Sequence, residues 1–490
     1  MIYSAAIPTN IDTALRSHLI RQDGQEDLCF ALWNPSRGET RTTALVNDLV
    51  LPLDGDRYVH GNASFESQYV ERVVSEAMRL RTGIAFLHSH LGPGWQGMSP
   101  DDVRAEIGLA GRVMGATGLP LVGLTVGTDG AWSARFWEKS GPRKYDRRWA
   151  SSVRVAGDAL RTTFNDSLLP APRPNSRLVR TISAWGDERQ AQLARLRIGV
   201  VGAGSVGCLI AESLARMGIG HVLLIDFDSV EEVNLDRLLH ATQADIGRAK
   251  VEVLAAAIRR SATADNFRVQ TSESSVVEKD GFLKALDCDL LFSCVDRPWA
   301  RFALNLIAYA HLIPVVDGGI AIRSRAGRGL RHCSIRAHAV APGRRCLECL
   351  GQYNSGLVSV ERDGLLDDPS YIEGLPAEHE LRARENVFGF SAVAAALETM
   401  QMLSMVISPS GASNPGAQIY HFVSGDVDKV GESACGQSCY FRSVIAKGDR
   451  VGISCIGEHH VAERERALRR NQRPSWWGRA WRWLASKAGW

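Results

Sequence analysis

The sequence has little of several features that mark particular protein classes. Ten cysteines in 490 residues are too few for a disulfide-held scaffold, so paired cysteines indicate metal or redox sites. No uncharged apolar run reaches the roughly 18 residues that a membrane-spanning helix needs. The first residues lack the basic and apolar segments of a secretory signal, so we expect a cytoplasmic protein. With 45% hydrophobic and 23% charged residues, the composition excludes a mainly disordered or fibrous protein.

Excess charge of one sign is confined to the end of the chain. The formal net charge is +3, but residues 461–490 hold eight Lys and Arg against two Glu, so the rest sums to −3. A nucleic-acid-binding surface is therefore not expected on the body of the protein. Five of the twelve tryptophans lie in the last 15 residues, among these basic side chains. Packing on the protein or a dimer partner, docking into another protein and membrane contact all stay open for this tail.

The chain divides into four segments. Residues 1–165 mix short apolar runs with helical patterns, and the Pro-rich residues 166–178 are the expected linker. Residues 179–458 form the next segment, where a β-α-β-α rhythm from Arg197 predicts an α/β fold with an open, mostly parallel sheet. Residues 459–490 form a tail. Strands are expected at 197–202, 221–226, 267–271, 288–294 and 313–317, and helices at 205–217, 246–260 and 298–311. A helix expected over 99–115 would place on one face Val103, Ile107, Ala110 and Val113.

Two histidines and an acid have the spacing of a metal site. His88 and His90 are two apart on a predicted strand, so both side chains point to one face. Ser99 is the expected N-cap of the next helix, and it places Asp102 in the first turn, facing the strand. Two imidazoles and a carboxylate suit zinc, with a fourth position left to water in a catalytic site. A helix cap and a lone His-x-His without metal are the alternative interpretation.

The whole pattern, His-Ser-His followed by Ser-x-x-Asp at a helix start, resembles the JAMM (JAB/MPN) metalloprotease signature over roughly residues 10–140. The resemblance implies a mixed α+β domain with catalytic zinc and a glutamate on an earlier strand as general base. Glu26 stands where the family places that base, and Glu39 is the weaker candidate. Ser99 resembles the residue that hydrogen-bonds the tetrahedral oxyanion.

One departure from the family concerns the loop before the helix. The loop after His90 is one residue longer than the family pattern, so Asp101 stays an alternative to Asp102 as a ligand. We expect an active zinc metallopeptidase, and a degenerate domain kept for binding is the alternative.

A glycine-rich turn follows the first strand of the β-α-β-α region. Gly202, Gly204 and Gly207 form G-x-G-x-x-G between a strand and a helix, where backbone N–H groups can hold phosphates. Asp226 ends the next strand, placed for ribose hydroxyls. These features alone suit NAD and ATP equally, so a nicotinamide oxidoreductase stays open on them.

The residues that follow favour ATP. Asp226, Asp228, Asn234, Arg237 and Lys250 lie in a D-x-D…N-x-x-R…D-x-G-x-x-K pattern that closely resembles ubiquitin-activating and ThiF-like adenylyltransferases. Attack of a carboxylate on the α-phosphate concentrates negative charge. Arg237 and Lys250 can compensate this charge, and Asn234 can hold a phosphate oxygen without adding any.

The same resemblance assigns four further residues. Asp296 matches the acid that helps to hold Mg²⁺, and Arg301 and Asn305 continue the cofactor-binding pattern on the next helix. Arg180 resembles an arginine that reaches the ATP site of the partner protomer, which implies a homodimer.

Four cysteines form two close pairs. Cys346 and Cys349 make a C-x-x-C, and Cys435 and Cys439 a C-x-x-x-C, which predicts a structural zinc site; a redox pair is the alternative. Thioester-forming members of the family keep a catalytic cysteine between such pairs, but residues 350–434 contain none. The chain therefore resembles members that adenylate a C-terminal glycine without keeping a thioester. Cys455 is the one other cysteine placed to be a mobile thiol.

These features predict a two-enzyme fusion that acts on a ubiquitin-like protein with a C-terminal glycine. One half would adenylate that glycine with MgATP, and the other would trim the precursor or remove the modifier from targets. The next acceptor would be a conjugating-enzyme-like partner or a sulfur donor. Such fusions resemble proteins of bacterial ubiquitin-like modification operons, several of them linked to phage defence. Sulfur-carrier activation for biosynthesis and a non-catalytic, modifier-binding scaffold are the alternatives.

Overall fold

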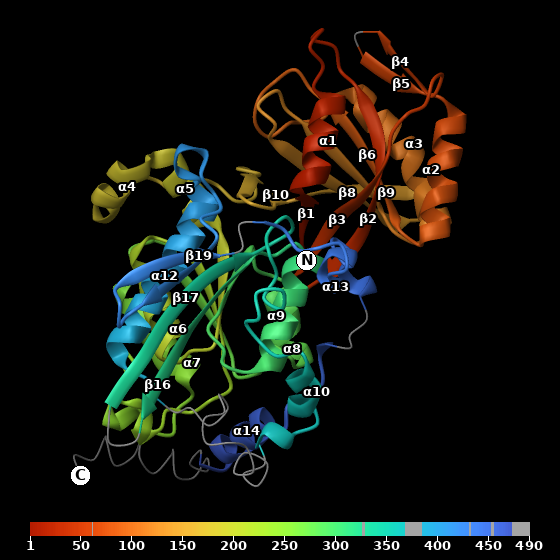
Figure 1. The fold of residues 1–490 in the computed structure, drawn as a ribbon. Coiled ribbons are helices and arrows are strands. Elements are labelled where there is room, and N and C mark those ends of the chain that lie inside the picture. The colour runs from red at the N-terminus through yellow and green to blue at the C-terminus, as the bar shows by residue number, and fades with distance from the viewer. Residues whose placement is uncertain (61, 326–328, 368–384, 431–432, 452–454, 473–490) are drawn as a thin grey trace, which may run out of the picture.

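The computed structural model describes residues 1–60, 62–325, 329–367, 385–430, 433–451 and 455–472 (Figure 1). The Trp-rich part of the tail, residues 473–490, lies outside them. The chain forms two lobes, each built on one large sheet. The N-terminal lobe is drawn in red and orange, and the C-terminal lobe runs from yellow through green to blue.

The N-terminal lobe holds a mixed nine-stranded sheet in the order β11-β10-β1-β3-β2-β6-β7-β8-β9. Its strands are β1 (Ile2–Pro8), β2 (Leu28–Arg37), β3 (Arg41–Val50), β6 (Gly83–Ser89), β7 (Leu121–Val126), β8 (Trp132–Gly141), β9 (Lys144–Trp149), β10 (Ser152–Ala156) and β11 (Leu160–Phe164). Its helices are α1 (Thr9–Leu19), α2 (Ser67–Leu80) and α3 (Pro100–Thr117), and a separate hairpin joins β4 (Arg57–His60) to β5 (Asn62–Phe65).

Strand β2 shows why this sheet is covered on both faces. Its alternate residues Leu28, Phe30 and Leu32 join the apolar cluster under α2 and α3. Cys29, Ala31 and Trp33 join the cluster under α1 on the opposite face. Successive side chains of a strand point to opposite faces, so an unbroken apolar run fits a central strand between two helical layers.

The C-terminal lobe holds an eight-stranded sheet in the order β14-β13-β12-β15-β16-β17-β18-β19. Its strands are β12 (Arg197–Val201), β13 (His221–Ile225), β14 (Arg268–Ser272), β15 (Leu290–Ser293), β16 (Val315–Arg325), β17 (Gly329–Val340), β18 (Ala417–His421) and β19 (Asp426–Val430). Strands β12 to β16 are parallel, and β17, β18 and β19 add antiparallel pairs. The expected α/β fold with a Rossmann-like sheet is confirmed.

The helices of this lobe lie on both sides of the sheet or at its ends (Figure 1). They are α4 (Val179–Trp185), α5 (Asp187–Arg195), α6 (Ser205–Arg216), α7 (Lys250–Ser261), α8 (Lys279–Ala285), α9 (Pro298–Ala310), α10 (Gly356–Arg362), α12 (Phe388–Ile407), α13 (Tyr440–Ser443) and α14 (His460–Gln472). Short 3-10 turns are η1 (Ser176–Leu178), η2 (Glu232–Asn234), η3 (Gln243–Asp245), η4 (Leu365–Asp367), η6 (Pro409–Gly411) and η7 (Gly448–Arg450). Helix α7 begins at Lys250 instead of the expected residue 246, because Gly247 has a positive φ of 84°.

Among the described residues, α12 alone is long and apolar enough, by length and composition, to cross a membrane. It packs against β16, β17 and α6, and 50% of its most apolar 18-residue stretch is buried inside the protein. Its Met402 and Met405 join the cluster around β12 and α6, so this surface belongs to the core of the lobe.

The two lobes meet through a buried interface. Leu160 and Phe164 of β11 pack in the same apolar cluster as Leu193 and Leu196, next to β12. The Asp287 carboxylate accepts hydrogen bonds from the backbone N–H groups of Thr40 (3.0 Å) and Arg41 (2.9 Å). The peptide of residues 166–178 is therefore only one of several connections between the lobes.

A buried charge network reinforces this interface. The Arg41 guanidinium lies 2.6 Å from the Asp289 carboxylate, and Arg154 lies 3.8 Å from it. Arg154 also donates to the carbonyl oxygens of Leu312 (3.0 Å) and His311 (3.1 Å). Burial and the Arg154 charge lower the pKa of His311 to about 3, so this imidazole stays neutral. Removing one partner of such a pair costs about 3–5 kcal/mol, because the other charge stays buried.

Candidate metal centre and nucleotide site

The end of β6 and the start of α3 bring His88, His90 and Asp102 together. The Nε2 atoms of the two histidines are 3.2 Å apart. Asp102 Oδ1 lies 3.4 Å from Nε2 of His88, and Asp102 Oδ2 lies 3.3 Å from Nε2 of His90. One ligand atom from each side chain lies within 4.8 Å of the others, so the three fit the donor set of a zinc site with one position left open.

The charges in this cluster support one another. Burial opposes ionisation of Asp102, but hydrogen bonds from both histidines hold its pKa well below the usual value. The hydrogen bond to Asp102 raises the pKa of His90, whereas burial lowers the pKa of His88. The cluster therefore pairs a carboxylate with two imidazoles of different basicity.

Helix capping selects Asp102 rather than Asp101. Ser99 is the N-cap, its Oγ accepts the Asp102 N–H at 3.1 Å, and Asp102 Oδ2 accepts the Ser99 N–H at 2.6 Å. This reciprocal pair turns the Asp102 carboxylate toward the strand. Asp101 is exposed and pairs with Arg104 on the outer face, so it is not brought to the histidines.

Glu26 lies beside the same cluster, in the loop before β2. The side chain is partly buried; burial raises its pKa, and the charges of His90 and Asp102 act on it in opposite directions. The next residue fixes this loop, since Asp27 N donates to Ser89 Oγ and Ser89 N donates to Asp27 O, both at 3.0 Å. Ser89 separates the two histidines, so the loop is tied directly to them.

Glu39 lies elsewhere. It is exposed in the turn between β2 and β3, and its backbone N–H donates to the carbonyl of Leu283 in the C-terminal lobe at 3.1 Å. The geometry favours Glu26 over Glu39 as the base.

A buried ion pair behind His88 was not expected from the sequence. Arg135 on β8 and Glu106 on α3 are both fully buried, and Arg135 Nε donates to Glu106 at 3.0 Å. Arg135 Nη1 also donates to Thr125 Oγ1 at 2.6 Å, and that oxygen lies 3.3 Å from Nε2 of His88. Because an arginine only donates, the Thr125 hydroxyl accepts from Arg135, and its own proton can reach Nε2 of His88 only while that nitrogen binds no metal. A Cβ on Gly123 would lie 2.5 Å from this pair, so the glycine makes room for it.

In the C-terminal lobe, the glycine turn joins β12 to α6. Gly202 has a φ of 95°, and a Cβ there would lie 2.3 Å from the carbonyl oxygen of Cys294. A Cβ on Gly207 would lie 1.9 Å from the Gly202 carbonyl, so both positions require glycine for packing. A Cβ on Gly204 would meet no protein atom within 4 Å. Gly204 caps α6 without a side-chain hydrogen bond, which suits an N-terminus that binds phosphate.

Asp226, Asp228 and Lys250 form a charged group beside this turn. Asp226 accepts the N–H groups of Ala203 (2.6 Å) and Asp228 (2.7 Å), which ties the turn to the end of β13. Burial, with the nearby Asp228 charge, raises the pKa of Asp226 to about 6. Lys250 Nζ lies 2.7 Å from Asp228, and although burial opposes its charge, Asp226 and Asp228 raise its pKa.

Asn234 and Arg237 are engaged locally. Asn234 is buried and its Oδ1 accepts the Glu231 N–H at 3.2 Å, which caps η2. Arg237 donates to Asp236 at 2.8 Å and to the Val233 carbonyl. Contact of either side chain with a phosphate would require it to exchange these partners.

Asp296 and Arg180 are both exposed. Asp296 lies in the turn between β15 and α9, at the same sheet edge as the glycine turn, because β12 and β15 are parallel neighbours. An exposed carboxylate suits Mg²⁺, which prefers oxygen ligands and keeps several waters. Arg180 lies on α4, which stands out at one side of the C-terminal lobe (Figure 1).

Arg301 and Asn305, which the family pattern assigns to the cofactor, have protein partners in this structure. Arg301 donates to the carbonyls of Gln352 and Gly318, each at 3.1 Å, and its Nε lies 3.3 Å from Asp317. Asn305 is fully buried and its Oδ1 accepts the Leu347 N–H at 3.2 Å. Both side chains hold the segment after β17, and Arg301 also holds β16, so their role at the cofactor stays a prediction.

The four expected cysteine ligands converge. One sulfur each from Cys346, Cys349, Cys435 and Cys439 lies within 4.8 Å of the others. The Cys346 N–H donates to the Cys435 sulfur at 3.1 Å, and the Cys349 N–H donates to the Cys346 sulfur at 3.3 Å. Hydrogen bonds, the largest from the Cys346 thiol, lower the pKa of Cys435 to about 5, which favours a thiolate. This donor set fits a structural zinc site.

Cys455 is a correction to the sequence interpretation. It is 2% exposed, and burial raises the pKa of its thiol to about 11. It is therefore not a mobile, reactive thiol.

The family comparison concerns the C-terminal lobe. The ThiF family model matches residues 176–434 and leaves residues 1–175 outside the match. Escherichia coli MccB with ATP shares 17% identity over 55% of this chain and 74% of that chain, with a TM-score of 0.42.

Curated relatives match over shorter stretches. Molybdopterin-synthase adenylyltransferase of Escherichia coli is 31% identical over 165 residues, 33% of this chain and 61% of that protein. Ubiquitin-like modifier-activating enzyme 5 of Caenorhabditis briggsae is 34% identical over 176 residues, 34% of this chain and 39% of that protein. The chain thus spans less than two thirds of the length of either relative. With the family match covering more than half of the sequence, the chain belongs to the ThiF family.

Proposed function

We propose that this chain adenylates the C-terminal glycine of a ubiquitin-like or sulfur-carrier protein. The observation that carries the proposal is the group of Asp226, Asp228 and Lys250 beside the glycine turn, at the carboxyl ends of parallel strands. This edge is where open α/β sheets bind nucleotides. The names of the relatives support the class of substrate, since they include enzymes that activate a ubiquitin-like modifier. The adenylating domain would span residues 179–458, after a linker at 166–178 and before the tail at 459–490.

The reaction joins a carboxylate of the substrate protein to the α-phosphate of ATP and releases pyrophosphate. The N–H groups at the start of α6 would hold phosphates, and Asp226 would accept ribose hydroxyls. Lys250 and Arg237 would offset the charge that develops on the phosphates, and Asp296 would hold Mg²⁺. Arg180 on the exposed α4 would reach the site of a second protomer in a homodimer.

The activated C-terminal glycine would be passed on to an acceptor on another protein. No cysteine occurs between residues 350 and 434, so this chain offers no family-type thioester there. The acceptor would be a cysteine of a conjugating-enzyme-like partner or a sulfur donor.

A second activity is supported by the N-terminal lobe, which would be a JAMM-like zinc metallopeptidase over residues 1–165. The observation that favours it is the convergence of His88, His90 and Asp102, with Glu26 beside them. Zinc bound there would polarise the scissile carbonyl and activate water. Glu26 would take a proton from the attacking water and deliver it to the leaving amine. Ser99 Oγ already accepts the Asp102 N–H, so its own proton can stabilise the oxyanion.

Pyrophosphate exchange tests the adenylation proposal. Wild type should exchange labelled pyrophosphate into ATP only when a ubiquitin-like partner with a free C-terminal glycine is present. Asp296→Ala should lower the exchange rate about 100-fold or more. Undiminished exchange by Asp296→Ala would remove Asp296 as the magnesium ligand, and no exchange with any such partner would contradict the proposal.

Cleavage of a tail-extended modifier tests the peptidase proposal. Glu26→Gln should abolish cleavage and leave zinc bound, because the side chain is a base and not a ligand. Glu39→Gln is the matched control and should cleave normally, since Glu39 is exposed in a turn whose backbone bonds to the other lobe. Cleavage by Glu26→Gln at the wild-type rate would exclude Glu26 as the base.

A further inference from the structure

We propose that the C-terminal segment 455–472 is part of the adenylation machinery, with Arg469 as a positioning residue for the turn that carries Asp228. The inference rests on the proposed adenylation site. It concerns how that site is held in place, and no residue of α14 need touch the nucleotide.

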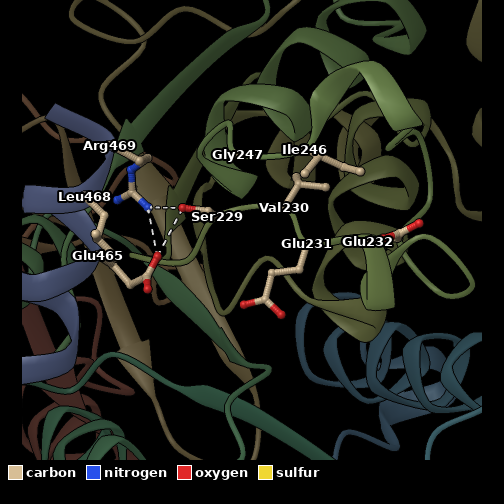
Figure 2. Close-up of a pocket in the computed structure, with 9 residues that line it drawn as sticks. All are labelled: Ser229, Val230, Glu231, Glu232, Ile246, Gly247, Glu465, Leu468 and Arg469. Atoms are coloured by element: carbon tan, nitrogen blue, oxygen red, sulfur yellow. Dashed lines mark hydrogen bonds and ion pairs between the residues drawn. The ribbon is translucent and has the colours of Figure 1, made fainter. Parts of the chain in front are cut away.

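Helix α14 contacts this turn through polar side chains (Figure 2). Arg469 is 8% exposed, and its Nη1 donates to Ser229 Oγ at 2.7 Å. The Ser229 hydroxyl donates in turn to Glu465 Oε2 at 3.2 Å. A second arm of the guanidinium, Nε, donates to Glu273 at 3.0 Å, just beyond β14. The guanidinium therefore joins the turn after β13 to the end of the neighbouring strand.

Ser229 is the residue through which this contact reaches the site. It follows Asp228 directly, and it forms an isolated antiparallel bridge with Ala249, the residue before Lys250. On the same two segments, the Lys250 N–H donates to the Asp228 carbonyl at 2.9 Å. A shift of Ser229 would therefore move Asp228 and Lys250 relative to each other.

The same C-terminal segment contacts the Asp228 turn a second time and also reaches the turn that carries Asp296. The His459 ring lies 4.8 Å from the ring of Phe227, which separates Asp226 from Asp228. The His459 ring also stacks on the ring of Trp299, with ring centroids 6.0 Å apart. Trp299 follows Asp296 by three residues, and its Nε1 donates to the carbonyl of Cys455 at 2.9 Å. The segment thus bridges the two turns that carry the acids.

The direct contacts between α14 and the Ser229 turn are hydrogen bonds, beside a cavity that the two elements leave open. A cavity of about 300 Å³ lies between α14 and the loop 229–247, lined by residues that include Glu231, Ile246 and Leu468. Leu468 is 48% exposed. Because this cavity keeps the helix and the loop from packing closely there, the hydrogen bonds of Arg469 determine how the two are placed.

The helix itself supplies a matched control. Arg466 lies one turn earlier and donates to Glu278 (2.6 and 2.8 Å) and to the Glu273 carbonyl (3.0 Å), but it does not contact Ser229. Arg466→Ala removes as much charge and a similar set of hydrogen bonds from α14. Only Arg469→Ala removes the link to the Asp228 turn.

The test compares Arg469→Ala, Arg469→Lys, Arg466→Ala and Ser229→Ala in the full-length protein. In pyrophosphate exchange, Arg469→Ala should raise the KM for ATP about tenfold, the equivalent of one charge-assisted hydrogen bond, and leave the KM for the partner protein unchanged. Arg469→Lys should recover part of this loss, and Ser229→Ala should add nothing to Arg469→Ala. Equal effects of Arg469→Ala and Arg466→Ala would overturn the inference.

Hydrogen–deuterium exchange separates this inference from the proposed function. Arg469→Ala should speed exchange of the amides of residues 226–230 more than Arg466→Ala does, in protein without ATP. A wild type that neither binds ATP nor exchanges pyrophosphate contradicts the function, and the amide rates still decide the positioning role. Unchanged amide rates in Arg469→Ala would overturn it.

Discussion

The metal centre and the nucleotide site differ in what their charged side chains contact. At the metal centre, the donor atoms of His88, His90 and Asp102 converge to within 3.2–3.4 Å of one another. At the nucleotide site, Lys250 pairs with Asp228 and Arg237 with Asp236, so the cations that would meet phosphates are already neutralised. The first site is preformed by the fold, whereas the second must exchange partners when its ligand binds.

The physical cause lies in the supporting elements. The two histidines lie at the end of a central strand, and Asp102 is fixed by a capping box on a helix that packs on that strand. Asn234 and Arg237 belong instead to a short 3-10 turn and the loop after it, where neighbouring residues satisfy each side chain. The difference predicts that substitutions at the metal centre abolish metal binding by removing a ligand. Substitutions at the nucleotide site should instead change how its charged side chains pair with one another and with phosphates.

The largest effect is expected at the metal centre. His88→Ala should lose the N-terminal zinc and all cleavage, because the two donors that remain, His90 and Asp102, do not form a zinc site by themselves. Asp102→Asn should also lose zinc, although an amide oxygen can still accept the Ser99 N–H and keep the helix start. Metal analysis of the purified proteins measures both, with Asp101→Asn as a control that should keep its zinc. Full zinc in Asp102→Asn would show that Asp102 acts only as a cap.

A smaller effect is expected at the nucleotide site. Lys250→Ala should lower pyrophosphate exchange about 100-fold, because a buried cation that offsets phosphate charge is removed. The variant should not lose much stability, since Asp228 is partly exposed and can be solvated. Exchange rates and thermal unfolding check the two statements. Wild-type exchange by Lys250→Ala would contradict its role.

The support behind His88 offers a third prediction. Thr125→Val removes the hydroxyl that accepts from Arg135 beside the His88 ring, and should weaken zinc binding about 10–100-fold because the ring is then placed less firmly. Thr43→Val is the matched control, since it removes a buried hydroxyl bonded to Ser4 in the same sheet. Competition with a chelator measures both affinities. Equal affinities in the two variants would exclude an orienting role for Thr125.

The last prediction concerns folding stability rather than either site, and it depends on pH and on Glu361 of α10. This carboxylate accepts the Trp299 N–H at 2.8 Å near Asp296, and burial raises its pKa from 4.5 to about 7. A raised pKa means that the folded state binds the proton more tightly. The stabilisation is therefore complete below about pH 4.5 and is lost as the pH rises through 7, by at most about 3 kcal/mol.

Glu361→Gln should remove this dependence. The variant should gain stability relative to wild type between pH 5 and pH 8, as judged by chemical unfolding at each pH. A constant difference between the two proteins over this range would contradict the assignment.

The sequence predicted those parts of the sites that depend on short spacings. Period two in β6 and the capping pattern of α3 place His88, His90 and Asp102 together, and the two cysteine pairs also converge. The resemblance to ThiF-like enzymes is confirmed by the family match over residues 176–434.

Contacts between distant segments could not be predicted in this way. Periodicity placed Ile107 on the buried face of α3, but Ile107 is 47% exposed and Glu106 is buried, because Arg135 on β8 pairs with it. Arg301 and Asn305 fit a family pattern, yet their partners lie on β16 and on the segment after β17. Cys455 is buried by Trp299 and its neighbours, which no local pattern indicates.

Zinc stoichiometry by native mass spectrometry tests most directly the claim that one chain carries a preformed metal centre beside a separate adenylation site. The account predicts two zinc ions per wild-type chain, one at the four cysteines and one at the histidines. The His88→Ala/His90→Ala variant should hold one zinc and exchange pyrophosphate at the wild-type rate. A single zinc in both proteins would contradict the N-terminal metal centre, and loss of exchange in the variant would contradict the separation of the two sites.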